Sequence, residues 1–426
     1  MKHFIMAGVS TLALLAAGAA FADSSTSNVT QAGPNQGATV DQSGATGALS
    51  TIDQKGGSNT ASVTQDGNSS ESLILQGQAT GNADTGNVAT VTQEGDSYSK
   101  IEQTDDDSTA TVDQNGDGNN STVTQSADDN ITSVRQEGDG NTSTVTQSNA
   151  ANLADVVQSD DNNTSTVIQS GNLAAALVTQ SGSGNTSTVN QSATTLSGAI
   201  VEQSGDDNES IITQRPTGGH QANVWQDGNR NYSKVDQGGV AQEAGEFLDE
   251  TENGVIQSGD DNDSDIKQRG GFQSAYVEQI GSRNDSIIDQ GAAGGFLGIG
   301  AGVAQEASVT QIGHDNTSLI TQRGIDQGAE VKQGGNNNHS TIDQGGDFGS
   351  LHTASVDQGG NLNTSMIFQR GTNQDATVVQ TGDENISEIT QNGSNHVANV
   401  YQHGTGDFSE VIQSGSGHTA TVTQHQ

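Results

Sequence analysis

The feature that most constrains the fold of this chain is a short repeat that continues over almost its entire length. A β-branched residue followed two places later by glutamine recurs 34 times between Gln31 and Gln424, most often at a spacing of 11 residues. Odd-numbered units carry serine four residues before the glutamine, whereas even-numbered units carry alanine there in 15 of 17 cases. The sequence therefore contains 17 repeats of about 22 residues, each built of two unlike halves.

Each half of the repeat predicts one strand followed by one turn. Side chains alternate between the two faces of a strand, so the residues six, four and two places before the glutamine share a face with it. In one such unit this face consists of Asn316, Ser318, Ile320 and Gln322. The Gly/Asp/Asn cluster after the glutamine, as in Asn115–Gly118, is typical of tight turns because these residues tolerate positive φ angles.

A stack of strand–turn–strand–turn rungs satisfies this pattern. We expect each strand to pair in parallel and in register with its equivalent one repeat further on, about 4.7–4.9 Å away. The predicted fold is therefore all-β: a parallel, two-sheet, amyloid-like β-solenoid with about 17 rungs of about 22 residues. One sheet contains the serine-type strands and the other the alanine-type strands, and their small side chains allow the sheets to approach closely.

The residues on the inward face are the candidate functional residues, because equivalent side chains are expected to stack in columns. Stacked glutamine amides can each donate to one neighbour and accept from the other, as in the ladders of cross-β structures. The predicted glutamine ladder includes Gln31, Gln42, Gln54, Gln65, Gln114, Gln125, Gln136, Gln147, Gln322, Gln333, Gln391, Gln402, Gln413 and Gln424. The predicted apolar ladder includes Val123, Val134, Val145, Val156, Ile320, Val331, Ile389 and Val400. The predicted core asparagines are Asn119, Asn141, Asn163, Asn185, Asn208, Asn262, Asn316, Asn338 and Asn385.

The N-terminal residues 1–22 have the pattern of a secretory signal peptide. Lys2 precedes a short apolar run, and Ala20 and Ala22 form a small-residue site, so we expect cleavage before Asp23. No later segment has the roughly 18 consecutive apolar residues that a spanning helix needs. The mature chain, residues 23–426, is thus expected to be secreted without a membrane span and to form a single solenoid.

The rhythm of the repeat is interrupted near residues 77–86, 238–250, 291–304 and 345–351. We interpret these four insertions as loops that bulge from the surface. The alternative is that Phe247-Leu248 or Phe296-Leu297 docks fibres laterally or binds a partner.

Composition excludes several classes of protein. With 29% hydrophobic and 3% aromatic residues the chain cannot fill a broad globular core. A net charge of −39 disfavours nucleic acid as a partner, because phosphate binding needs a basic surface. Acidic groups such as Asp105–Asp107, Asp160-Asp161 and Asp206-Asp207 are expected in turns, where their repulsion would oppose premature association. The chain has no cysteine, so no disulfide contributes to stability.

Motifs that carry chemistry are weak in this sequence. The segment Asp261–Asp265 resembles the start of a calcium loop, but Ile266 stands where glycine is required and Phe272 where a bidentate glutamate is required. The glycine-rich segment 298–302 lacks the lysine of a phosphate-binding loop. We expect His396 and His418 to stack on neighbouring rungs as amide-like ladder residues, with a metal ladder or a pH switch as the alternative. No nucleophile, base and orienting group recur together, so we expect no enzyme, no metal and no cofactor.

The repeat resembles the curlin repeat, the unit of bacterial curli fibres. The signature Gln-x-Gly-x-x-Asn-x-Ala-x-Ile/Val-x-Gln is nearly complete in Gln391–Gln402, and the resemblance extends from Ser25 to Gln424. It implies an extracellular amyloid fibre with roles in biofilm matrix, adhesion and surface colonisation, and curli-type export and nucleation proteins as partners, beside matrix or host surfaces. The asparagine of the signature belongs here mainly to serine-type strands, and the chain is much longer than typical subunits. Both a major and a nucleating role therefore stay open.

Assembly is expected to follow from the ends of the stack. The unit Thr419–Gln424 keeps the full pattern, so an open strand edge is expected to recruit the first rung of another copy, head to tail. The alternative function is a monomeric binding solenoid. Its ice-binding or polysaccharide-binding surface would be the outward threonine rows, such as Thr142, Thr144 and Thr146.

Overall fold

The computed structural model describes residues 24–77, 86–192, 196–215, 219–239, 243–244, 254–291, 304–345 and 351–425. The predicted signal peptide lies outside these residues. The contacts divide the chain into two compact units, with unit 1 extending to Leu196 and unit 2 beginning at Ser197. The sequence indicates a single solenoid, and each of the two units is by itself a solenoid.

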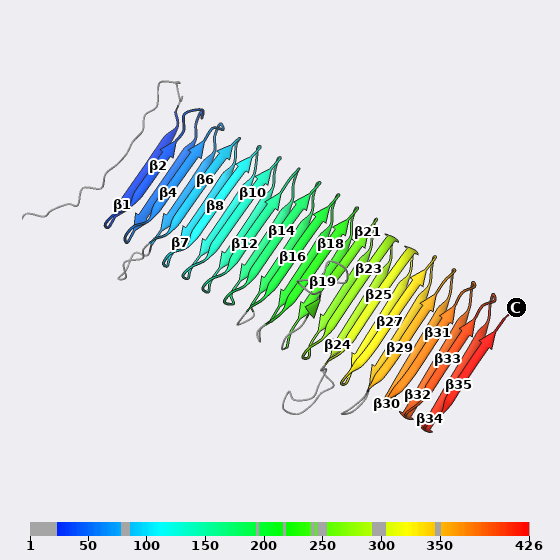
Figure 1. The fold of residues 1–426 in the computed structure, drawn as a ribbon. Coiled ribbons are helices and arrows are strands. Elements are labelled where there is room, and N and C mark those ends of the chain that lie inside the picture. Colours follow the sequence, from blue (N-terminus) through cyan, green and yellow to red (C-terminus); the bar gives the residue numbers. More distant parts are fainter. Residues whose placement is uncertain are drawn as a thin grey trace, which may run out of the picture. The chain divides into compact units, whose positions relative to one another are not determined.

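Unit 1 is a two-sheet parallel β-solenoid (Figure 1). Its serine-type sheet contains β1 (Thr26–Ala32), β3 (Leu49–Lys55), β5 (Glu71–Gln76), β7 (Tyr98–Gln103), β9 (Asn120–Gln125), β11 (Thr142–Gln147), β13 (Thr164–Gln169) and β15 (Thr186–Gln191). Its alanine-type sheet contains β2 (Gly37–Asp41), β4 (Thr60–Gln65), β6 (Val88–Glu94), β8 (Thr109–Asn115), β10 (Ile131–Glu137), β12 (Leu153–Gln158) and β14 (Ala175–Ser181).

Unit 2 has the same two-sheet parallel architecture. Its serine-type sheet contains β17 (Glu209–Gln214), β19 (Tyr232–Gln237), β22 (Asp263–Gln268), β24 (Asp285–Gly291), β26 (Thr317–Arg323), β28 (His339–Gly345), β30 (Thr364–Thr372), β32 (Ile386–Ser394) and β34 (Phe408–Ser416). Its alanine-type sheet contains β16 (Gly198–Ser204), β18 (Gln221–Asp227), β20 (Glu243–Ala244), β21 (Gly254–Ser258), β23 (Ser274–Ser282), β25 (Glu306–His314), β27 (Gln327–Gly334), β29 (His352–Gln358), β31 (Gln374–Gln380), β33 (Val397–Gln402) and β35 (Thr419–Gln424).

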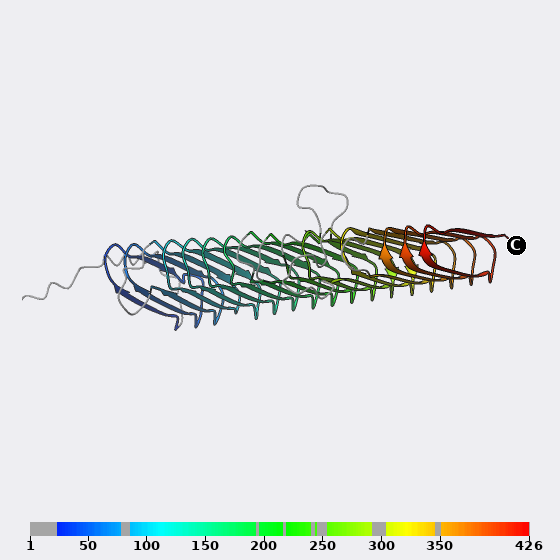
Figure 2. The same cartoon turned by 90° about the horizontal axis from the view of Figure 1, so that it is seen from below.

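Neighbouring strands in a sheet are equivalent strands of successive repeats. In the β9–β11 pair, Ser121 lies beside Ser143 and Gln125 beside Gln147, both 22 residues apart. In unit 2, β31 and β33 pair in the same way. Viewed at right angles to Figure 1, the strands of each unit form two layers joined by turns (Figure 2). The predicted fold class is confirmed: equivalent residues of successive repeats pair in parallel and in register.

The core is the narrow space between the two layers. In β8, Ala110, Val112 and Gln114 are buried, whereas Thr109 and Asp113 point outward. The same alternation recurs in the other strands, as expected for a period of two. A thin interior lined by one small, one branched and one amide side chain per strand needs few hydrophobic residues, which explains the low hydrophobic content of the chain.

The turns depend on glycine at defined places. Gly116 has a φ of +116°, and a Cβ atom built there would lie 2.2 Å from the carbonyl oxygen of Gly138 in the next turn. Only glycine adopts this backbone conformation without strain and also allows the turns to stack so closely.

One insertion differs from its prediction. The sequence placed residues 238–250 in a surface loop, but Glu243 and Ala244 pair with Gln221 and Ala222 of β18 as the short strand β20. The sheet then resumes at β21, where Val255 lies beside Val224. Ala244 thus occupies the alanine position of this rung, although it lies 13 residues before Gln257 and not four. The remaining residues of this insertion, and residues 78–85, 292–303 and 346–350, lie outside the described part of the chain.

Candidate functional site

The most regular feature of the interior is a column of glutamine side chains in each sheet. In the serine-type sheet of unit 1, Gln125 Nε2 donates to Gln147 Oε1 at 2.9 Å, and Gln147 Nε2 donates to Gln169 Oε1 at 2.8 Å. In the alanine-type sheet, Gln114 Nε2 donates to Gln136 Oε1 at 2.8 Å. The same bond occurs within unit 2, with 3.0 Å from Gln322 to Gln344 and 2.9 Å from Gln391 to Gln413.

The second N–H of each amide links the two sheets. Gln114 Nε2 also donates to the carbonyl oxygen of Tyr98, and Gln125 Nε2 to that of Thr109, both at 3.0 Å and both 16 positions earlier in the preceding strand. One amide group therefore joins consecutive rungs along its column and joins the two layers across the core. Glutamine suits this position because it offers two donors and an acceptor on a side chain long enough to span the gap.

The ladder has a direction. These glutamine–glutamine bonds run from an Nε2 donor to an Oε1 acceptor on the rung that follows in the sequence, from Gln31 to Gln54 and from Gln402 to Gln424 alike. At the first rung, the Oε1 atoms of Gln31 and Gln42 thus face outward along the column. At the last rung, the donors of Gln413 and Gln424 face the opposite way and bond to backbone carbonyl groups.

The apolar and small side chains form further columns beside the glutamines. The residues Val123, Val134, Val145, Val156, Ile320, Val331, Ile389 and Val400 are all at most 1% exposed. Within the described residues, the hydroxyl groups of the serine column from Ser50 to Ser365, including Ser121, Ser143 and Ser165, have no hydrogen-bond partner. Further along the column, Ser409 Oγ donates to Ser387 Oγ at 3.3 Å. These serines act as small spacers that let the sheets approach.

The asparagines are buried in the turns that precede the serine-type strands. Asn141 Nδ2 donates to the carbonyl oxygen of Asp160 in the next turn at 2.7 Å, and its backbone N–H donates to Asn119 Oδ1 at 2.9 Å. The same pattern connects Asn316 and Asn338 in unit 2. Asn163, Asn185, Asn208, Asn262 and Asn385 are likewise buried. This column holds successive turns together and aligns the strands that follow.

The first and last rungs leave one strand edge open in the described residues. There β1 pairs with β3 and β2 with β4, while β34 pairs with β32 and β35 with β33. Val29, Val40 and Val422 are half-buried, whereas the inward-facing valines of inner rungs, such as Val123 and Val331, are fully buried. Each end therefore presents backbone hydrogen-bonding groups together with partly exposed core side chains.

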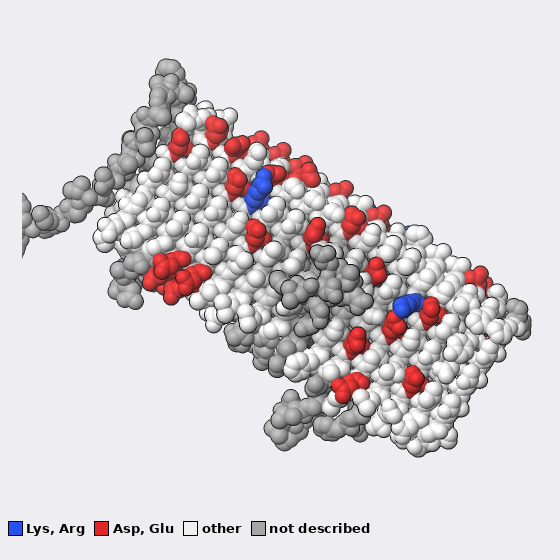
Figure 3. All heavy atoms as spheres, in the orientation of Figure 1, with Lys and Arg blue, Asp and Glu red and all other residues white. Residues whose placement is uncertain are grey.

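The charged groups of the outer surface are mostly acidic. The chain has 52 Asp and Glu residues against 13 Lys and Arg residues, and acidic side chains far outnumber basic ones on the face drawn in Figure 3. The acidic groups Asp105–Asp107, Asp160-Asp161 and Asp206-Asp207 lie in turns. Some turn carboxylates are paired: Arg230 and Arg283 form two-pronged bonds to Asp261 and Asp315, which lowers the pKa of both carboxyl groups.

A pair of carboxyl groups also lies side by side on the outer face of the serine-type sheet in unit 2. Asp263 of β22 is the in-register neighbour of Asp285 of β24. Partial desolvation raises the pKa of Asp263 to about 6, and the nearby carboxylates of Asp285 and Asp265 act in the same direction. This pair is therefore an acid-sensitive feature of the outer surface.

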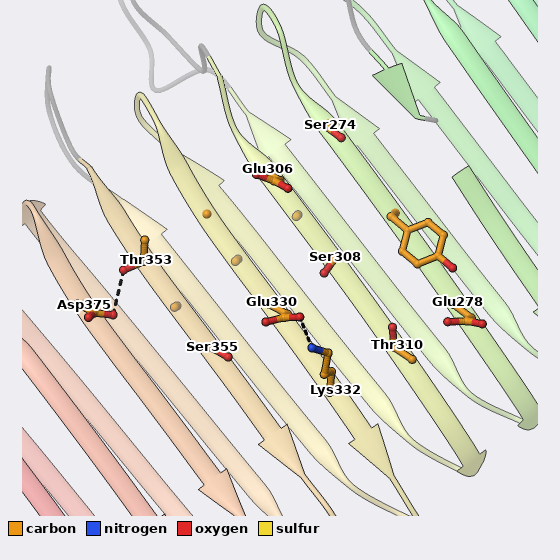
Figure 4. Close-up of a pocket in the computed structure, with 15 residues that line it drawn as sticks. Ser274, Glu278, Glu306, Ser308, Thr310, Glu330, Lys332, Thr353, Ser355 and Asp375 are labelled. Carbon is orange, nitrogen blue, oxygen red and sulfur yellow. Dashed lines mark hydrogen bonds and ion pairs between the residues drawn. The ribbon is translucent and has the colours of Figure 1, made fainter. Parts of the chain in front are cut away.

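A shallow groove of about 640 Å³ crosses the outer face of the alanine-type sheet in unit 2 (Figure 4). Its lining includes Gly328, Tyr276 and Glu306. The ammonium group of Lys332 pairs with Glu330 at 2.5 Å, and Thr353 Oγ1 donates to Asp375 Oδ1 at 2.9 Å. Its lining contains carboxylates and hydroxyl groups but no histidine or cysteine.

Four histidines lie six residues before the glutamine of alanine-type strands. The rings of His396 and His418 stack with centroids 5.2 Å apart and planes within 5°, which confirms the predicted stacking. The ring of His396 replaces an amide, because its Nε2 lies 3.1 Å from the carbonyl oxygen of Asn392 in its own turn. His220 and His352 take the same position, and burial lowers the pKa of both, to about 4 for His352.

The calcium-loop-like segment of the sequence forms other contacts in the structure. Asp261 pairs with Arg230, and the buried Asn262 belongs to the asparagine column. Within the described ranges, no group of three or more His, Cys, Asp or Glu residues is placed to hold a metal ion. The segment 298–302, Phe247-Leu248 and Phe296-Leu297 lie outside the described residues. Among the residues described, no helix has both the length and the apolar character needed to cross a membrane.

Sequence reasoning missed three features of the site. These are the direction of the ladder, the cross-sheet bond of each amide and the carboxyl pair formed by Asp263 and Asp285. The pair was visible in principle, because both residues lie five places before their glutamines.

Comparison with known families agrees with this architecture. Residues 106–138, 259–291, 360–393 and 394–425 match the model of a family described as the curlin associated repeat. The matched segments lie in both units and cover strands of both sheets. A search among curated proteins found no match.

Proposed function

Because this chain is a curlin-repeat protein with a β-solenoid fold, we propose that it is a structural subunit of an extracellular, curli-like amyloid fibre, and that it acts by assembly and not by catalysis. The observation that carries the proposal is the directional amide ladder, which ends in acceptors at one rung and in donors at another. A fibre subunit needs such unlike ends, because a heterologous contact that does not close on itself produces a filament.

Assembly proceeds by strand addition. The rung of β1 and β2 of an incoming copy continues the sheets beyond β34 and β35, with serine-type strand on serine-type strand. The amides of Gln413 and Gln424 then donate to the Oε1 atoms of Gln31 and Gln42 of that copy, as Gln391 and Gln402 do within the chain. Val29 and Val40 of the incoming rung cover Val411 and Val422.

The ladder also disfavours contact between two like ends of the solenoid. Two first rungs placed face to face would oppose acceptor to acceptor, and the strands could not continue in parallel register. An acceptor left unpaired in such a contact costs about 1–3 kcal/mol. The polarity of the columns therefore favours head-to-tail growth over pairing of like ends.

The family likeness and the N-terminal sequence support an extracellular setting. Curlin-repeat proteins are typically extracellular, and the N-terminal pattern of this chain is that of a signal peptide. We assign the fibre to the bacterial surface, with roles in biofilm matrix and adhesion and with curli-type export and nucleation proteins as partners. Matrix or host surfaces are its binding targets.

The proposal is tested with purified chain of residues 23–426. Incubation should give fibres that bind thioflavin T and show a reflection near about 4.7 Å in X-ray diffraction. Val422→Glu places a charge at the inward edge of β35 and should slow seeded elongation at least about tenfold, because it buries an unpaired charge at the contact. Thr421→Glu changes the outward neighbour and should elongate like the unchanged protein. A chain that stays monomeric, or a Val422→Glu variant that elongates as fast as Thr421→Glu, would contradict the proposal.

A further inference from the structure

The outer face of the serine-type sheet in unit 1 contains an uncharged patch rich in threonine. On β9, β11, β13 and β15, the positions five, three and one before the glutamine point outward and form what we name the threonine face. Of these 12 positions, nine are threonine, two asparagine and one isoleucine. In register, Thr144 lies between Thr122 and Thr166, so the side chains form straight rows.

The threonine face carries no charge, although the chain as a whole has a net charge of −39. The adjacent strand β7 bears Lys100 and Glu102, which form an ion pair at 2.9 Å. Asp113 and Asp155 lie on the outer side of the alanine-type sheet of the same unit. The turns at both ends of the threonine-face strands carry exposed carboxylates, including Asp128, Asp139 and Asp161.

We propose that the threonine face is the surface through which fibres of this protein associate side by side, each contacting the same face of a second copy. The inference rests on the proposed fibre function. Two chains of such high negative charge repel one another over most orientations, and a flat uncharged face is where they approach at least electrostatic cost. Threonine methyl groups and the 36% exposed side chain of Ile168 supply apolar contact, and the rows interdigitate as facing sheets do about 10 Å apart.

The size of the face explains why this contact belongs to fibres and not to single chains. Four strands at about 4.8 Å and six residues at about 3.3 Å give about 400 Å² on each copy, or about 800 Å² for the pair. Stable complexes bury about 1,200–2,000 Å² in total. One face is therefore too small to hold a dimer, but a fibre repeats it once per subunit, and the contacts add along its length.

The test is a charge introduced into the face with a matched charge elsewhere. Thr144→Asp/Thr166→Asp changes two in-register neighbours on β11 and β13, three places before their glutamines. Thr90→Asp/Thr111→Asp changes two in-register neighbours at the same repeat position on β6 and β8 of the other sheet. Both variants add the same charge to the same unit. Circular dichroism and seeded thioflavin elongation report on fold and growth, and electron microscopy counts filaments per bundle.

The face variant should elongate at the unchanged rate but form at least about tenfold fewer bundles, because each contact would now desolvate unpaired carboxylates. The control variant should bundle as the unchanged protein does. Fibres of Thr144→Lys/Thr166→Lys should co-bundle with fibres of the Asp face variant, which tests contact between like faces.

The inference is overturned if the face variant bundles normally, if the control loses bundling equally, or if the Lys and Asp fibres fail to co-bundle. Normal bundling with lost retention on crystalline cellulose would instead identify the face as a carbohydrate-binding surface. Unchanged protein that forms fibres but never bundles refutes this inference alone, whereas a failure to form fibres refutes the proposed function and the inference with it.

Discussion

Replacing one ladder glutamine by glutamate tests the energetic role of the amide column. Gln226 in β18 is 2% exposed, and its Oε1 accepts from Gln203 Nε2 at 2.8 Å. Its Nε2 group donates to Gln257 Oε1 at 2.9 Å and to the carbonyl oxygens of Glu209 and Asn231 at 3.0 and 3.1 Å. Gln226→Glu keeps the shape of the side chain but removes both N–H donors.

The cost follows from the contacts that are lost. Each buried acceptor left without a donor costs about 1–3 kcal/mol, and a carboxylate oxygen would face Gln257 Oε1 across the column. A buried charge without a partner adds to this loss, so the variant should lose about 3–5 kcal/mol at pH 7. Below the raised pKa of the new carboxyl group, a single O–H donor returns and part of the stability is recovered.

Asn223→Asp is the matched control, because it makes the same chemical change on the outward face of the same strand. It should alter stability by less than about 0.5 kcal/mol. Hydrogen exchange of β18 and β21, with denaturant unfolding of the full chain at pH 7 and pH 4, measures both variants. Equal stability of the two variants at pH 7 would refute the energetic role of the ladder.

Three further predictions concern pH, turns and assembly rate. The pKa of Asp263 is raised to about 6, so the folded chain holds its proton where the unfolded chain, with a value of 3.8, has lost it. Unfolding free energy should therefore fall by roughly 1 kcal/mol, after allowance for solvent screening, as pH rises from about 4 to 6. Asp263→Asn should remove this contribution and leave that of Asp285, whose pKa is also raised by desolvation, whereas Asp155→Asn, whose in-register neighbours are Ser133 and Leu177, should keep both. Gly393→Ala should destabilise well beyond Gly406→Ala in thermal unfolding, since a Cβ at Gly393 would lie 1.9 Å from the oxygen of Gly415 whereas that at Gly406 meets nothing within 4 Å. Gly406→Ala should itself cost about 1–2 kcal/mol for its left-handed conformation. Thioflavin-monitored polymerisation should accelerate at lower pH or higher salt as the turn carboxylates are neutralised or screened, and unchanged rates would count against their role in delaying assembly.

The fold could be predicted because the sequence contains two periodic patterns that specify the same structure. The alternation of two within a unit fixes which side chains point inward, and the repeat of about 22 residues fixes which strands are neighbours. Serine or alanine four places before the glutamine assigns each strand to one of the two sheets. A shift of the strand pairing by one residue would turn Val123 and Gln125 outward together. The hydrophobic pattern therefore specifies the register of the strands.

Other features could not be predicted, because they depend on geometry that the sequence does not encode locally. The direction of the amide ladder depends on the rotamer that every glutamine adopts together, and both directions satisfy the same residues. The pairing of Ala244 with Ala222 depends on where the chain returns to the sheet after the insertion. The rule that alanine lies four residues before the glutamine does not identify Ala244, because Ala244 lies 13 residues before Gln257. The desolvation of Asp263 depends on the neighbouring strands that surround its carboxyl group.

Side-chain contacts between glutamines of consecutive rungs test the central claim most directly. Solid-state NMR of chain labelled with ¹³C and ¹⁵N only at glutamine reports Nε2–Cδ transfer between different residues. The columns at 2.7–3.1 Å from Nε2 to Oε1 predict strong transfer between residues such as Gln31 and Gln54, or Gln268 and Gln290. Spectra with transfer only within each glutamine, or with amide protons that exchange as fast as those of solvent-exposed side chains, would contradict the account.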